Sequence, residues 1–184
     1  SRLGVISFTR KAIEEMVTRA CAEFNLEAKD FPHMRTSHSF GFRGLGLQSQ
    51  DVMNKEDYDN IGREIGLTFE GKIRANLRDG MSLPTLGGSG SKYLQLENRA
   101  RLRMIDLDTE FNQEGDRDLF FPKLEQLSKQ LIEYKAATSK YDYVDMIEKY
   151  ITLGIPPNLD YLFIDEAQDF TPLQWRMAEK IAEK

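Results

Sequence analysis

The sequence has 184 residues and a formal net charge of −5, with 40% hydrophobic and 30% charged residues, which suits one globular core or one core with a large insertion. Because the chain is acidic, we expect no general attraction to nucleic acid, although a narrow nucleic-acid track is still possible. The single Cys21 excludes a disulfide framework, so we expect a reducing, cytoplasmic setting. With only two histidines besides this cysteine, a structural zinc site is disfavoured. No apolar run reaches the roughly 20 residues of a membrane span, so we expect no membrane partner.

The first 45 residues alternate between strand and helix patterns. Residues 5–9 form a short β-branched and aromatic run that predicts a strand. Apolar residues then recur at spacings of three and four from residue 12 to residue 24, which predicts a helix with Thr9 at its N-cap. Residues 34–41 form a second short element, read as a strand, that runs into glycine-rich turns. Strand, helix and short strand in this order are typical of an α/β sheet.

From about residue 51 to residue 137 the sequence is largely polar and helical. The helical periodicity lies in four segments: residues 58–67, 71–77, 93–107 and 119–134. Two breaks separate them: Asp79-Gly80 through the glycine-serine stretch at residues 87–91, and residues 112–118. We interpret this region as an all-helical insertion. The glycine-serine stretch fits a natural loop better than an engineered linker.

The C-terminal part returns to a sheet pattern and ends in two acids. After a predicted helix at residues 143–150, the apolar run 161–164 predicts a buried parallel strand, and Asp165 and Glu166 follow it directly. Open α/β sheets bind ligands at the carboxyl ends of their strands, where nucleotide hydrolases use one carboxylate for Mg²⁺ and another to orient the attacking water. The alternative is a helix N-terminus at which acids are favoured by the helix dipole. Thr171-Pro172 predicts the start of the last helix.

Four short segments of the sequence resemble motifs of one protein family. Residues 7–16 (Ser-Phe-Thr-Arg-Lys-Ala-Ile-Glu-Glu-Met) resemble motif Ia of UvrD/Rep-like superfamily 1 DNA helicases, and residues 36–41 (Thr-Ser-His-Ser-Phe-Gly) resemble motif Ib. Residues 165–169 (Asp-Glu-Ala-Gln-Asp) match motif II, the Walker B segment, and residues 141–146 resemble the element before it. The resemblance implies an α/β fold, in which a partial RecA-like parallel sheet core is interrupted by an all-helical insertion. The implied domains are core residues 1–45, a 1B-type insertion at 46–140 and core residues 141–184.

The resemblance also implies a nucleotide site with ATP and Mg²⁺ as cofactors. Asp165 would coordinate Mg²⁺ through water, and Glu166 would polarise the water that attacks the γ-phosphate. Gln168 would sense the γ-phosphate or couple its loss to movement.

Single-stranded DNA is the partner that the resemblance implies for motifs Ia and Ib. Phe8 would stack against a base, and Thr9 would bind a neighbouring phosphate. Arg10 stands where motif Ia usually has Asn, and it would preserve the affinity for phosphate. Thr36 and His38 would make further contacts with the backbone or bases. Aromatic stacking contributes about 1–3 kcal/mol per base without requiring a particular sequence.

Simpler roles compete with these. Phe8 could belong to the core, Thr9 could act only as an N-cap, and His38 could be a structural histidine. A basic cluster in the insertion could be a solvated helix face or a DNA-backbone contact; it consists of Arg99, Arg101 and Arg103.

The sequence contains no Gly-x-x-x-x-Gly-Lys-Ser/Thr string, so the phosphate-binding Walker A loop is missing. The glycines before Lys92 do not supply it, because Tyr93 follows the lysine and no strand precedes the loop. We therefore expect a fragment that is inactive alone and whose partner is the remainder of a helicase, with the Walker A segment and a second RecA-like domain. Two other hypotheses are a non-catalytic DNA-binding or interaction module derived from a helicase core, and a metal-dependent nuclease that uses Asp165, Glu166 and Asp169.

Overall fold

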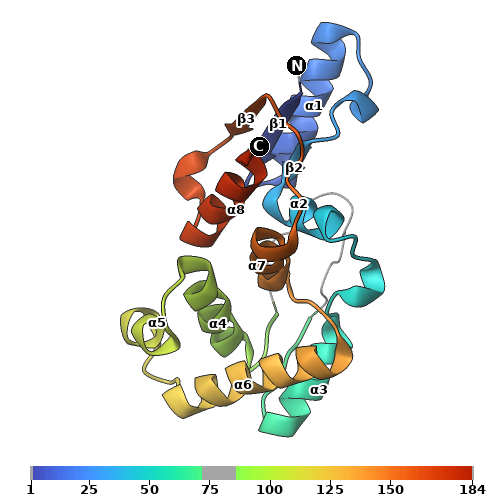
Figure 1. Ribbon diagram of the computed structural model, residues 1–184. Helices are drawn as coiled ribbons and strands as arrows, with labels where there is room; N and C mark the ends of the chain where they lie inside the picture. The colour runs from blue at the N-terminus through green and yellow to red at the C-terminus, as the bar shows by residue number, and fades with distance from the viewer. Residues whose placement is uncertain (1, 72–85, 184) are drawn as a thin grey trace. The chain divides into compact units, whose positions relative to one another are not determined.

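A computed structural model describes residues 2–71 and 86–183 (Figure 1). These residues form a mixed α/β structure with a three-stranded sheet and eight α-helices. Apart from Gly71, the predicted helix at 71–77 lies outside the described residues, as does the Asp79-Gly80 break. The described chain forms two compact units, one made of residues 2–47 and 145–183 and the other of residues 48–71 and 86–144.

The sheet of the first unit is entirely parallel. Its strands lie in the order β2-β1-β3: β1 (Leu3–Ser7), β2 (Met34–Thr36) and β3 (Tyr161–Ile164). Val5 of the central strand pairs with Met34 on one side and with Phe163 on the other. The predicted strands at both ends of the chain are therefore confirmed, and they are neighbours in one sheet.

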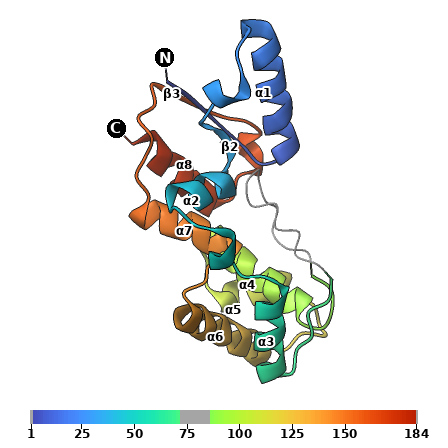
Figure 2. The ribbon, with the colours of Figure 1, turned by 90° about the vertical axis from the view of Figure 1, so that its right-hand side faces the viewer.

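Helices cover both faces of this sheet. The helices of this unit are α1 (Arg10–Phe24), α2 (Ser37–Gly44), α7 (Tyr143–Leu153, in this unit from Asp145 onward) and α8 (Pro172–Ala182), with short 3-10 turns η1 (Ala28–Asp30) and η3 (Ala167–Asp169). Figure 2 shows α1 on one side of the sheet and α8 on the other. Ile6 in the central strand is 1% exposed, as expected of a strand with both faces covered.

Residues 34–41 do not form one short strand as predicted. The strand β2 ends at Thr36, whose hydroxyl accepts a hydrogen bond from the Ser39 backbone N–H and caps α2. Gly41 lies inside this helix, at a position where a Cβ atom would come within 2.6 Å of the Met146 carbonyl oxygen. The glycine allows close packing of α2 on α7, so it marks a tight helix contact and not a turn.

The prediction that residues 161–164 are buried is wrong, although they do form a parallel strand. Tyr161 and Phe163 are 60% and 56% exposed, whereas Leu162 and Ile164 on the opposite face are partly buried. β3 is an edge strand among the described residues, and only one of its faces is covered. The apolar run predicted the strand but not its position in the sheet.

The second unit is helical, as the sequence predicts. Its helices are α3 (Lys55–Ile65), α4 (Ser91–Arg103), α5 (Leu107–Glu114) and α6 (Phe121–Thr138), with the 3-10 turn η2 (Ser49–Asp51). Its core includes Tyr58, Ile61, Leu94, Leu124, Leu127 and Leu131. Within the described part of this unit, strand pairing is limited to two isolated bridges, Val52 with Tyr141 and Glu70 with Gly87.

The segment predicted as one helical stretch at residues 93–107 is divided. Helix α4 ends at Arg103, and its C-cap Met104 adopts a left-handed conformation with φ 58°. Asp106 then begins α5 by accepting a hydrogen bond from the Thr109 N–H at 2.7 Å. Since α5 continues to Glu114, the predicted break at 112–118 starts later than expected.

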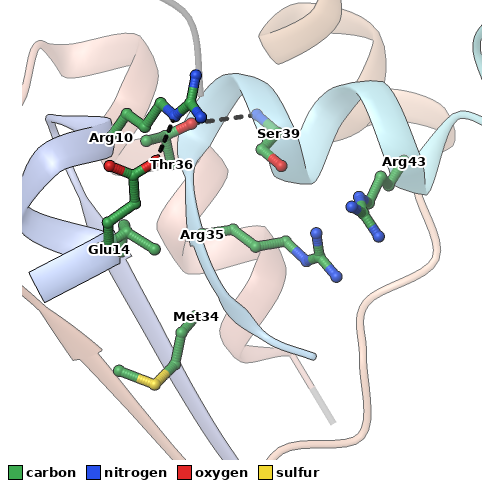
Figure 3. A pocket seen from close by; sticks show the side chains of 8 residues that line it. Arg10, Glu14, Met34, Arg35, Thr36, Ser39 and Arg43 are labelled. Carbon is green, nitrogen blue, oxygen red and sulfur yellow. Dashed lines mark hydrogen bonds and ion pairs between the residues drawn. The ribbon is translucent and has the colours of Figure 1, made fainter. Parts of the chain in front are cut away.

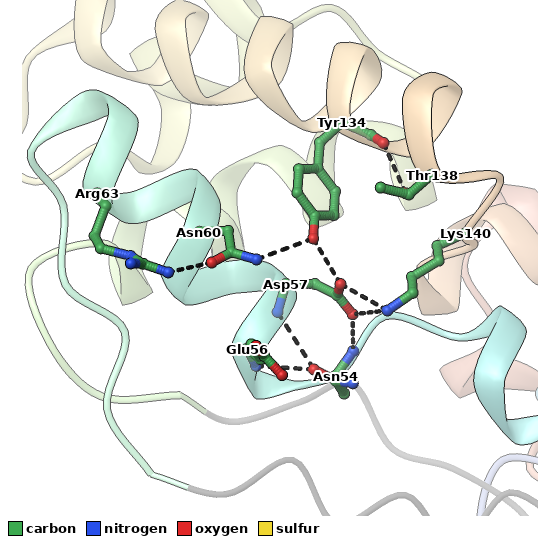
Figure 4. A network of polar contacts seen from close by, with 8 residues as sticks. All are labelled: Asn54, Glu56, Asp57, Asn60, Arg63, Tyr134, Thr138 and Lys140. Carbon is green, nitrogen blue, oxygen red and sulfur yellow. Dashed lines mark hydrogen bonds and ion pairs between the residues drawn. The ribbon is translucent and has the colours of Figure 1, made fainter.

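A buried polar network joins α3 to α6 and to the chain after α6 (Figure 4). Asp57 is 3% exposed and accepts hydrogen bonds from Lys140 Nζ at 2.7 and 2.8 Å, from the Tyr134 hydroxyl at 2.7 Å and from the Asn54 N–H at 2.7 Å. Burial alone would raise the pKa of Asp57, but these donors outweigh it and lower the pKa below its ordinary value of 3.8.

The second unit is therefore expected to lose stability in acid as Asp57 is protonated. Because its folded pKa is lowered, its stabilising contribution is complete well above pH 3.8 and is lost as the pH falls below that value. Asp57→Asn should cost about 1–2 kcal/mol at pH 7 and reduce the loss between neutral and acid pH. Urea unfolding followed by circular dichroism from pH 7 to pH 3 measures both effects; an unchanged pH dependence in the variant would contradict this assignment.

Candidate functional site

The carboxyl ends of the three parallel strands meet at one edge of the sheet. Phe8 and Thr9 follow β1, Ser37 follows β2, and Asp165 follows β3. Asp165 extends the pairing beyond β3, because its backbone N–H donates to the Ile6 carbonyl oxygen at 2.8 Å. The segments that resemble motifs Ia, Ib and II therefore leave the sheet at the same edge, where open α/β sheets bind ligands.

Asp165 is held by a side chain of the central strand. The Ser7 hydroxyl, 1% exposed, donates a hydrogen bond to Asp165 Oδ2 at 2.9 Å. The same hydroxyl oxygen accepts a longer bond of 3.4 Å from the Thr9 N–H. Ser7 thus connects the segment after β1 directly to the first acid after β3. It was not among the predicted site residues, and only the pairing of β1 with β3 reveals it.

Glu166 has an unusual backbone conformation. Its φ of 50° and ψ of 45° are left-handed, a region that non-glycine residues enter at a cost of about 1–3 kcal/mol. Its exposed carboxylate accepts a hydrogen bond from Gln168 Nε2 in the turn η3. Two predicted nucleotide-site residues therefore lie in contact, and a local strain of this kind is typical of functional sites.

The carboxylates suit Mg²⁺ held through water. Asp165 is partly buried, Ser7 binds its Oδ2, and Oδ1 has no hydrogen bond within residues 2–71 and 86–183, so it can accept from a metal-bound water. No group of three or more metal-binding side chains occurs in the described parts of the chain. Asp169 does not join Asp165 and Glu166 in a three-acid cluster, as the nuclease hypothesis would require.

The three motif Ia candidates are accessible to solvent. Phe8 is 50% exposed, so the alternative that it belongs to the core is wrong. Thr9 caps α1 by accepting a hydrogen bond from the Ala12 N–H at 3.2 Å, and it remains exposed. The Arg10 side chain is 36% exposed and its Nε lies 2.6 Å from Glu14 Oε1.

Thr36 and His38 are buried, with 3% and 7% exposure. The Thr36 hydroxyl caps α2, and the His38 ring lies in the interior of the first unit. The structural role that we considered for His38 agrees with this position. The sequence could not reveal the burial, because the start of a helix is equally compatible with a core face or an exposed one.

The basic cluster of the insertion is engaged within its own unit. Arg99 and Arg103 pair with the two carboxylate oxygens of Glu110 at 3.0 and 2.6 Å, and Glu110 is fully buried. Arg101 lies 2.8 Å from the buried Asp142. Both earlier interpretations of this cluster, a solvated face and a DNA contact, overlooked these carboxylates.

The glycine-serine stretch packs against Thr68. The Ser89 hydroxyl accepts a hydrogen bond from the Thr68 N–H at 3.0 Å, and the Gly90 N–H donates to the Thr68 carbonyl oxygen at 2.9 Å. These contacts fit a natural loop. They also occupy donors that a phosphate cradle would require.

A family model described as UvrD/REP helicase N-terminal domain matches residues 1–184. The chain therefore belongs to the UvrD/REP helicase family, whose members bind DNA and generally use ATP and Mg²⁺. A search of curated proteins gave no match. None of the described helices is long and apolar enough to cross a membrane.

Proposed function

We propose that this chain provides single-stranded-DNA contacts and the Walker B acids of an ATP-dependent DNA helicase. The observation that carries the proposal is the Ser7–Asp165 hydrogen bond, which joins the segment resembling motif Ia to the segment resembling motif II. A bound strand that shifts the segment after β1 would act on the magnesium ligand through one hydroxyl group. Such a direct connection suits an enzyme in which DNA controls nucleotide hydrolysis.

Each acid has a distinct role in this proposal. When bound, magnesium would supply charge stabilisation to the transferring phosphoryl group. Asp165 would hold a metal-bound water through its carboxylate, which Ser7 orients. Glu166 accepts the proton of the attacking water, and Gln168 restrains Glu166 through their hydrogen bond.

The DNA contacts that we propose begin with Phe8, Thr9 and Arg10. The exposed Phe8 ring stacks on a base, while Thr9 and Arg10 bind the adjacent phosphates. Thr36, predicted as a contact of motif Ib, acts from its buried position by capping the start of α2, and His38, also predicted as a contact, is buried in the first turn of the same helix. We retain the domain assignment of 1–45 and 141–184 as RecA-like core and 46–140 as 1B-type insertion.

The other partner in the proposal is the remainder of a helicase polypeptide. A phosphate-binding Walker A string does not occur within these 184 residues. One sheet face also presents Tyr161, Phe163 and the 37%-exposed Leu3 to solvent. Additional helicase structure that carries the phosphate loop would both complete the nucleotide site and cover these side chains.

Nucleotide hydrolysis tests the proposal in two forms of the protein. The 184-residue chain should show no single-stranded-DNA-stimulated ATP hydrolysis, because it lacks a phosphate loop. The polypeptide encoded by the whole gene should hydrolyse ATP, and Glu166→Gln should lower its turnover by about 100-fold or more while DNA binding persists. DNA binding without any turnover in that polypeptide would favour the non-catalytic module instead.

A further inference from the structure

Three cavities of the first unit share two arginines. Their volumes are about 110, 640 and 240 Å³, and Arg35 and Arg43 line all of them. We call the combined surface, which follows α1, β2 and α2, the arginine groove. In Figure 3, Arg10 from α1, Arg35 from β2 and Arg43 from α2 surround the smallest cavity.

The arginine groove has the opposite charge from the chain as a whole. Its lining contains four cationic side chains, those of Arg10, Lys29, Arg35 and Arg43, and a single carboxylate, that of Glu14. Glu14 pairs with Arg10. The lining therefore has three more cationic than anionic side chains, in a protein whose net charge is −5.

Two local features make these arginines suitable for an anion. Arg35 Nε donates to the Pro32 carbonyl oxygen, which orients its guanidinium group. Arg43 is exposed, and no carboxylate in the described parts of the chain pairs with it. Burial first, and the charge of Arg35 second, lower the pKa of His33, so this histidine is neutral at pH 7 and adds no charge to the groove.

We propose that the arginine groove binds the phosphodiester backbone of single-stranded DNA, as a continuation of the track that starts at Phe8. The inference rests on the proposed function. Arg10, a proposed phosphate contact, and Thr36 line the smallest cavity together with Arg35 and Arg43, so the two surfaces are continuous. Guanidinium groups bind phosphate oxygens in a bidentate manner. The apolar floor formed by Ile13 and Met34 suits sugars and bases between the phosphates.

The experiment measures binding of a fluorescein-labelled oligothymidylate to the 184-residue chain by anisotropy over a range of salt concentrations. Each phosphate contact to a single strand contributes about 0.7 to the slope of log affinity against log salt. The double variant Arg35→Gln/Arg43→Gln should therefore lose about 1.4 from this slope. Its affinity at about 0.1 M salt should fall by about 25-fold, or about fivefold for each arginine.

A matched control removes the same number of charges elsewhere in the first unit. Arg19 and Arg176 are exposed and do not line the groove, so Arg19→Gln/Arg176→Gln should leave the slope within about 0.3 of the original. Arg35→Lys/Arg43→Lys keeps the charge and should retain most of the slope, which separates loss of charge from misfolding. Equal slopes for the two glutamine variants would overturn the proposal.

Other outcomes separate this proposal from the proposed function. If Phe8→Ala weakens binding but the Arg35/Arg43 glutamine variant does not, the groove is not part of the DNA track and the helicase assignment stands. If the unaltered chain does not bind the oligonucleotide, both proposals fail. If labelled oligoglutamate binds through Arg35 and Arg43 and the oligonucleotide does not, the groove is a site for acidic peptides and the DNA proposal is wrong.

Discussion

Phe8→Ala is expected to weaken oligothymidylate binding by the 184-residue chain between about fivefold and 150-fold. A base stacked on an aromatic ring contributes about 1–3 kcal/mol, and alanine removes the ring while leaving the backbone after β1 unchanged. Phe8 is 50% exposed, so its removal creates no large cavity in the core. Fluorescence anisotropy measures the affinity, and a thermal melt checks that the fold persists.

Phe24 provides the control for Phe8. It is 66% exposed and lies at the opposite end of α1, so Phe24→Ala should change affinity by less than about twofold. Phe8→Trp retains a stacking surface and should keep most of the affinity. If Phe8→Ala and Phe24→Ala bind equally well, the ring of Phe8 does not contact a base.

Asp142→Ala is expected to destabilise the second unit by about 3–5 kcal/mol. The Asp142 side chain is 4% exposed and lies 2.8 Å from Arg101 Nη1 and 2.6 Å from Lys135 Nζ, and both of these side chains are largely buried. Burial would raise the pKa of Asp142, but these two cations lower it, so the group is ionised at neutral pH. Alanine would leave the positive charges of Arg101 and Lys135 close together without this carboxylate. Removing one partner from a buried ion pair is strongly destabilising.

Urea unfolding at pH 7 measures this loss, with Asp116→Ala as the control. Asp116 forms an ion pair with Lys92 in which both side chains are about half exposed, so its removal should cost less than about 1 kcal/mol. A second variant, Asp142→Asn, keeps the shape and some hydrogen bonding and should be less harmful than alanine. A loss for Asp142→Ala as small as that for Asp116→Ala would contradict the buried-network account.

Much of the fold could be predicted because its signals are local. The periodicity from Ala12 to Phe24 and the cap at Thr9 identify α1, and Thr171-Pro172 identifies the start of α8. The helix α2 was missed because glycine has a low helix propensity. Close packing of Gly41 on Met146 outweighs this cost, and such a contact depends on tertiary structure.

The candidate site could be predicted in part for the same reason. The apolar run before Asp165 and Glu166 indicates that acids follow a strand, and sheet geometry then indicates where ligands bind. The Ser7 contact with Asp165 requires knowledge that β1 and β3 are neighbours. Arg35 and Arg43 belong to different elements and share no motif, so only their common cavities single them out.

Nuclear magnetic resonance of the 184-residue chain tests most directly whether metal and DNA sites share one edge of the sheet. Mn²⁺ in place of Mg²⁺ should broaden the amide signals of Asp165 and Glu166 most strongly. Oligothymidylate should shift the signals of Phe8, Thr9 and Arg10. Broadening centred on acids of the second unit, or DNA-induced shifts that spare the segment after β1, would contradict the account.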